Sequence, residues 1–88
     1  MKILKFGAIW CPGCLVMSKI WNEIVSEYEL EIEDYDIDLN EKECEQYNIT
    51  DTLPVYIFLN KNNVELERLI GEQSKEQLIN IIEKYKND

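Results

Sequence analysis

The stretch Phe6-Gly7-Ala8-Ile9-Trp10-Cys11-Pro12-Gly13-Cys14 places two cysteines, separated by two residues, between a strand pattern and a helix pattern. Residues 2–7 predict a short strand that ends at Gly7. Cys11 falls at an expected helix N-cap, and Pro12 falls at the first helical position, where its missing N–H costs nothing. Apolar side chains then recur at helical spacing and predict a buried stripe: Met17, Ile20, Trp21, Ile24 and Tyr28.

The middle of the chain predicts a second strand and a short second helix. Apolar and acidic residues alternate over residues 30–39, with an irregularity near Asp34. Asn40, with Glu43 three residues on, predicts a capped start to a helix over about residues 41–47.

The third and fourth strands are predicted to form a hairpin. Residues 54–59 predict a buried strand, and a polar turn at 60–63 leads back into a strand over 64–70. Val64 and Leu66 are expected to face inward there.

The last element is a helix that begins at a capping-box pattern, Ser74 with Gln77, shortly after Gly71. The order is therefore β-α-β-α-β-β-α. We expect an α/β fold in one domain over residues 1–88, with a four-stranded mixed sheet flanked by three helices, because the first βαβ unit should be parallel.

Charge excludes several partners. The 88 residues carry a formal net charge of −9, which opposes binding to nucleic acid and to anionic membranes.

Apolar residues make up 45% of the chain, enough for a core without a disulfide scaffold. The first residues are too short an apolar run for a signal peptide or membrane span, so we expect a soluble, cytoplasmic monomer.

The three cysteines, Cys11, Cys14 and Cys44, do not form a disulfide framework. Two cysteines separated by two residues at a helix start can form a disulfide in one oxidation state and a reactive thiolate in the other. The N–H groups and the positive end of the helix dipole favour a thiolate at Cys11. We therefore expect Cys11 to attack, and Cys14, one turn further in and more buried, to resolve. Cys44 is expected to be a packing thiol.

The same pair could instead be half of a metal site. Zinc usually takes four ligands, and the chain offers no histidine and only Cys44 as a third thiol. We expect no metal and no cofactor beyond the Cys11–Cys14 disulfide itself.

The sequence resembles the thioredoxin superfamily over nearly its whole length. The matching stretches are residues 6–14, the acidic run Asp36-Ile37-Asp38-Leu39-Asn40, Tyr47-Asn48-Ile49 before Leu53-Pro54, and Gly71 with Ser74-Lys75-Glu76-Gln77-Leu78. The resemblance implies a thiol–disulfide oxidoreductase, an enzyme that carries electrons to protein disulfides.

The resemblance also implies a docking surface around the cysteines. Its site-shaping residues would be Trp10, Pro12, Gly13, Leu53, Pro54 and Gly71. Pro54 would be the cis-proline of the family, and Leu53 would pair its backbone with an extended substrate segment.

Some features differ from thioredoxins and are similar to glutaredoxins. The chain lacks the N-terminal strand and helix of full thioredoxins, and Pro12-Gly13 reverses their usual order. The Gly-Gly turn that binds glutathione is absent, since Gly71-Glu72-Gln73 stands there. A thioredoxin-reductase-like partner is therefore expected to recharge the pair. The alternatives are a glutaredoxin-like, glutathione-dependent reductase and a non-catalytic thiol or metal-binding module.

Lys5 occupies the position where thioredoxins keep a buried carboxylate that helps the second cysteine lose its proton. Either its ammonium reaches solvent from the strand edge and does nothing chemical, or it lies under the cysteine pair and stabilises a thiolate. We expect the first, because burying an unpaired ammonium is costly.

Overall fold

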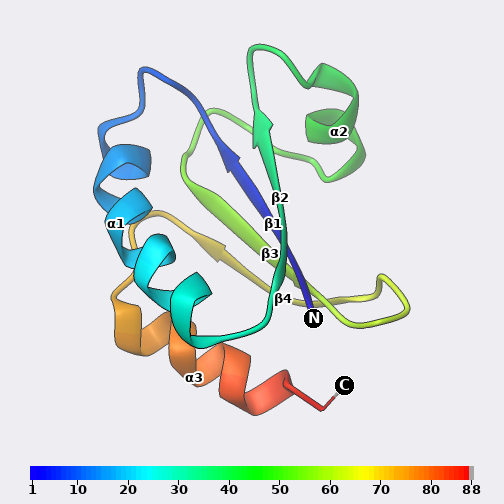
Figure 1. Cartoon of the computed structure of the whole chain (residues 1–88). Helices are drawn as coiled ribbons and strands as arrows, with labels where there is room; N and C mark the ends of the chain where they lie inside the picture. Colours follow the sequence, from blue (N-terminus) through cyan, green and yellow to red (C-terminus); the bar gives the residue numbers. More distant parts are fainter. Residues whose placement is uncertain (88) are drawn as a thin grey trace.

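The computed structural model describes residues 1–87, in which four strands form one mixed sheet in the order β2-β1-β3-β4 (Figure 1). β1 (Lys2–Gly7) runs parallel to β2 (Glu31–Asp36). β3 (Val55–Leu59) is antiparallel to both β1 and β4 (Glu65–Ile70). The predicted α/β fold and mixed sheet are confirmed, and β1 and β3 are its two central strands.

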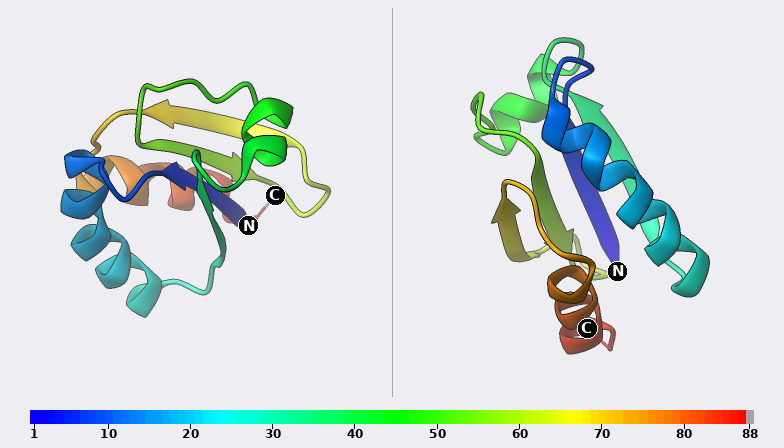
Figure 2. Two further views of the ribbon diagram at one scale, coloured as in Figure 1. Left: turned by 90° about the horizontal axis from the view of Figure 1, so that it is seen from above. Right: turned by 90° about the vertical axis from the view of Figure 1, so that its left-hand side faces the viewer.

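Three helices cover the sheet. α1 (Pro12–Glu27) and α3 (Lys75–Tyr85) pack on one face, whereas α2 (Glu41–Gln46) lies against the other (Figure 2). The capping box that begins α3 is present as predicted, with Ser74 and Gln77 bonded reciprocally. None of these helices is long and apolar enough, within residues 1–87, to cross a membrane.

The core has two parts because side chains alternate across the central strands. Ile3 and Tyr56 belong to the cluster under α1 and α3, which we call the α1 face. Leu4 and Phe6 belong to the cluster on the side of α2, the α2 face. By the same alternation Lys5 is directed to the α1 face, where its ammonium lies over the ring of Trp21 in α1.

The irregularity predicted near Asp34 is wrong. β2 pairs with β1 without a break, with Lys5 opposite Asp34 and Phe6 opposite Tyr35. The apolar pattern changes phase because both faces of β2 are covered: Ile32 packs against the α1 face and Tyr35 against the α2 face.

Two local predictions also need correction. Asn40 precedes α2 as expected, but its side chain makes no cap; Oδ1 accepts the backbone N–H of Asp36 instead (2.9 Å). Val64 is exposed, because it lies in the turn before β4, where its carbonyl accepts the N–H of Asn60 (3.0 Å).

Cys44 is a buried thiol of the α2 face, in agreement with its expected packing role. Burial raises the pKa of this thiol. It is thus kept protonated, and the sheet lies between it and α1, the helix that carries Cys14.

Candidate active site

The site is built on the N-terminus of α1. Cys11 is the N-cap residue, with the extended backbone (φ −88°, ψ 110°) that turns the chain into the helix, and Pro12 is the first helical residue. The Sγ of Cys11 accepts the backbone N–H of Cys14 (3.2 Å), one of the donors that a helix start leaves unpaired. No acidic residue stands in the first turn. This environment favours negative charge on the Cys11 sulfur.

The second thiol, Cys14, has a raised pKa. Burial and the hydrogen bond with Cys11 raise the pKa of Cys14 to about 11. Negative charge on Cys11 raises it further, so the pair does not readily carry two thiolates. At neutral pH Cys14 is therefore a protonated thiol.

The order of exposure is the reverse of the prediction. Cys11 is only 4% exposed, whereas Cys14 is half-buried and borders an open hollow of about 400 Å³. Exposure alone would favour Cys14 as the attacking group, whereas electrostatics favours Cys11. The thiolate and not the thiol is the nucleophile, so the two observations point to different cysteines as the attacking group.

Gly7 also belongs to the site. The sequence analysis named it only as the end of a strand and as part of the segment that resembles thioredoxins. A Cβ atom built on it would lie 2.9 Å from the Sγ of Cys14, closer than such atoms approach in proteins. The glycine thus leaves the space in which the second sulfur sits. Its position four residues before Cys11 was the only available signal.

Four of the residues expected to shape the docking surface meet beside the cysteines. The Leu53–Pro54 peptide bond is cis, and Pro54 accepts the N–H of Gly71 (2.7 Å). Pro54 also contacts the helix start, because a Cβ on Gly13 would lie 3.3 Å from its ring. Leu53 is adjacent, and within residues 1–87 its backbone groups have no hydrogen-bond partner.

Glu72 also reaches this surface, although the sequence reading gave it no role. A Cβ atom built on Gly13 would lie 3.3 Å from a carboxylate oxygen of Glu72. This acidic group, which belongs to the turn after β4, therefore lies against the cysteine loop. Apart from the motif comparison at Gly71-Glu72-Gln73, nothing in the sequence indicated this contact.

Trp10 is 56% exposed beside Cys11, and its indole Nε1 donates a hydrogen bond to Asp38 (2.8 Å). That bond fixes the indole against the loop after β2. Further exposed apolar side chains flank the cysteines on the chain: Ile9, Leu15 and Val16. The approach to the thiols is thus apolar with an acidic margin.

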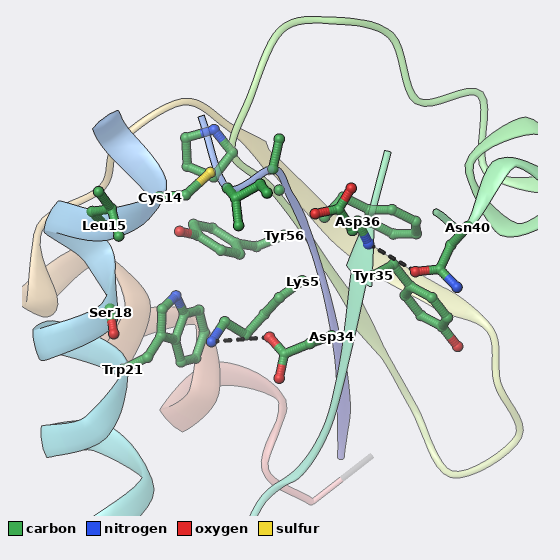
Figure 3. A pocket seen from close by; sticks show the side chains of 15 residues that line it. Lys5, Cys14, Leu15, Ser18, Trp21, Asp34, Tyr35, Asp36, Asn40 and Tyr56 are labelled. Atoms are coloured by element: carbon green, nitrogen blue, oxygen red, sulfur yellow. Dashed lines mark hydrogen bonds and ion pairs between the residues drawn. The ribbon is translucent and has the colours of Figure 1, made fainter. Parts of the chain in front are cut away.

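Lys5 lies inside the hollow beside Cys14, so its expected position at a strand edge is wrong. β1 is a central strand, and the Lys5 side chain is 22% exposed (Figure 3). Its Nζ pairs with Asp34 (3.3 Å) and stands over the Trp21 ring, 5.5 Å from the centroid. These partners remove the cost of an unpaired ammonium, which was the reason for expecting it in solvent.

No three acidic, cysteine or histidine side chains gather into a metal-holding group in the part of the chain that the structure describes. Cys44 packs in the α2 face, whereas the other two cysteines lie at the start of α1.

Fold and site together define the class of thiol–disulfide oxidoreductases with a thioredoxin-like fold. The chain belongs to the thioredoxin family, whose model, described as Thioredoxin, matches residues 1–84. It is similar to thioredoxin of Staphylococcus aureus, with 24% identity over 87 residues that cover 97% of this chain and 82% of that protein.

Solved structures agree. Thioredoxin 1 of the thermophilic eubacterium Thermosipho africanus is 30% identical and superposes with a TM-score of 0.86, covering 98% of this chain and 94% of that one. A mutant thioredoxin from Halobacterium salinarum reaches a TM-score of 0.89 at 20% identity, covering 99% and 75% of the two chains; that likeness concerns the fold alone.

The state of the two thiols predicts selective alkylation. At pH 7 a limiting amount of iodoacetamide should label Cys11 and spare Cys14, because a pKa of about 11 leaves only about one Cys14 in ten thousand ionised. Labelling of Cys14 should rise about tenfold per pH unit below that pKa. Fragment mass spectrometry of the labelled peptide measures both sites, and faster labelling of Cys14 than of Cys11 at pH 7 would contradict the assignment.

The space at Gly7 predicts a specific effect of one methyl group. Gly7→Ala should displace the Cys14 sulfur and slow closure of the Cys11–Cys14 bond by about tenfold or more. Gly13→Ala is the matched control, because its Cβ would meet mainly the flexible Glu72 side chain and the Pro54 ring at 3.2–3.3 Å. Oxidation by oxidised dithiothreitol, followed by thiol counting, measures closure; equal rates in both variants would refute the close-packing argument.

Proposed function

We propose that this chain is a dithiol reductant of protein disulfides, in which Cys11 attacks, Cys14 resolves and a thioredoxin-reductase-like enzyme restores the dithiol. The redox-active group is the cysteine pair itself, without a further cofactor. A reducing, cytoplasmic setting is part of this proposal, because a dithiol reductant needs surroundings that keep its thiols reduced.

The reaction runs in two exchanges. The Cys11 thiolate attacks one sulfur of the substrate disulfide; a Cys11–substrate bond forms, and the other substrate sulfur leaves as a thiolate that takes up a proton. Cys14 then loses its proton and attacks the Cys11 sulfur. The Cys11–Cys14 bond forms, the second substrate sulfur leaves, and the substrate is reduced by two electrons as the pair is oxidised.

One observation carries this division of roles. The hydrogen bond from the Cys14 N–H to the Cys11 Sγ stabilises charge on the first sulfur, while the pKa of about 11 keeps the second protonated. A second thiolate would compete for the substrate, whereas a protonated thiol waits until the mixed disulfide has formed.

Substrate docking is supported by the surface beside the pair. The Leu53 backbone groups, unbonded within residues 1–87, would accept an extended segment as an added strand. The exposed Trp10 and Ile9 side chains would contact apolar residues of the same segment. A partner with basic groups around its disulfide suits the acidic margin made by Asp38 and Glu72.

The charges near the site favour a reductase over glutathione as the electron donor. Glutathione carries carboxylates that need cationic partners. The Glu72 carboxylate stands at the site, and the Lys5 ammonium is already engaged by Asp34. A net charge of −9 acts in the same direction.

Serine substitutions test the roles of the cysteines. Cys11→Ser should abolish the reduction of insulin disulfides, because the attacking thiolate is lost, whereas Cys14→Ser should accumulate mixed disulfides that non-reducing electrophoresis detects. Cys44→Ser is the control and should keep turnover, since this thiol lies in the α2 face. If Cys44→Ser is as damaging as Cys11→Ser, the packing role of Cys44 is wrong. Stoichiometric metal in the purified protein without insulin reduction would favour a non-catalytic module.

The electron donor is tested on the oxidised protein. Thioredoxin reductase with NADPH should reduce the Cys11–Cys14 bond much faster than glutathione does at millimolar concentration. NADPH consumption at 340 nm follows the first reaction, and alkylation of released thiols follows the second. Faster reduction by glutathione would favour the glutaredoxin-like alternative.

A further inference from the structure

The ammonium of Lys5 is placed by the register of the sheet. In that register Lys5 lies between Asp34 of β2 and Tyr56 of β3, on the face that α1 covers. Its side chain and that of Cys14 line the same hollow (Figure 3). Among the described residues that line the hollow, Lys5 is the one cation.

The two charges of the Lys5–Asp34 pair are not equally screened. The side chain of Lys5 is 22% exposed, whereas that of Asp34 is 74% exposed. Water therefore weakens the field of the carboxylate more than that of the ammonium. A group inside the hollow experiences a net positive contribution from the pair.

Several charged or titratable groups lie around Cys14. Cys11 accepts its backbone N–H at the start of α1, and the side chains that line the hollow with it are Lys5 from β1, Asp34 and Asp36 from β2, and Tyr56 from β3. Tyr35 of β2 also borders the hollow but packs in the α2 face, and Glu72 lies beside Gly13 in the turn after β4. Burial raises the pKa of Tyr56 to about 12, so this hydroxyl is neutral at neutral pH. Apart from the ammonium, the charges are negative and disfavour a second thiolate. The charge of Lys5 acts in the opposite direction and lowers the pKa of Cys14.

We propose that Lys5 is a positioning residue for the resolving step: its ammonium, held beside Trp21 of α1 by Asp34, stabilises the Cys14 thiolate when it forms. The inference rests on the proposed roles of Cys11 and Cys14. In this proposal a cation aids the deprotonation of Cys14. It does so at the position where thioredoxins keep a buried carboxylate.

In this step Lys5 neither accepts nor gives a proton. Cys14 gives its proton to solvent water, which the open hollow admits. Its thiolate attacks the Cys11 sulfur, the Cys11–Cys14 bond forms, and the bond between Cys11 and the substrate sulfur breaks. The substrate sulfur leaves with the electron pair and takes a proton from solvent.

The experiment titrates Cys14 directly. In a Cys11→Ser, Cys44→Ser background Cys14 is the only thiol, and its rate of alkylation against pH gives the midpoint of its ionisation. Lys5→Met should raise this midpoint by about 0.5–1 unit, whereas Lys5→Arg should keep it near the value with lysine. At neutral pH the Cys14 thiolate fraction should fall about three- to tenfold in Lys5→Met.

Lys2→Met is the matched control, because it removes the same charge from the same strand. Lys2 pairs with Glu31 and Glu33 at the far end of β1, on the opposite face from Lys5, and should leave the midpoint unchanged. Lys5→Met is expected to fold, since the Asp34 that loses its partner is mostly in water.

If Lys5→Met and Lys2→Met give the same midpoint, or if Lys5→Arg behaves like Lys5→Met, the proposal is overturned. Neither result would touch the proposed function, because the titration needs no turnover. Loss of the proposed function would instead appear as failure of the unsubstituted protein to reduce insulin.

Discussion

The hydrogen bond from the Cys14 backbone N–H to the Cys11 sulfur is the interaction on which the chemistry of this protein depends. It exists because Cys11 occupies the N-cap of α1, where an ordinary helix would use a hydroxyl or carboxylate oxygen. Using sulfur there exposes the reactive atom to the unpaired donors and to the positive end of the helix. In the proposed reaction, the residue that caps the helix is thus also the residue that attacks the substrate.

The sheet supports this helix start from below. Two central strands, β1 and β3, fill both faces with apolar side chains and so fix where α1 begins relative to the sheet. Gly7 at the end of β1 lets the Cys14 sulfur approach the strand, and Pro54 before β3 packs against Gly13. The site therefore joins segments from β1 to the turn after β4, although its two cysteines are separated by only two residues along the chain.

Charge is distributed unevenly in this acidic chain. Carboxylates lie at the margin of the docking surface, where Asp38 holds Trp10 and Glu72 stands beside Gly13. Among the described residues, Lys5 is the one cation that lines the hollow with Cys14, and it is paired with a carboxylate that faces water. In the proposed mechanism, negative charge selects the partner, while positive charge acts on the sulfur that reacts second.

The sequence predicted the order of the elements, the Cys11 N-cap and the capping box at Ser74 correctly, because these follow from the spacing of a few residues along one segment. It placed Lys5 at a strand edge, an irregularity at Asp34 and the greater burial at Cys14, and all three were wrong. Each depends on which strands are neighbours and which faces are covered: β1 is central, both faces of β2 pack, and the hollow opens beside Cys14. Such long-range packing leaves no local pattern in the chain, so these features become visible only when the strands and helices are seen packed together.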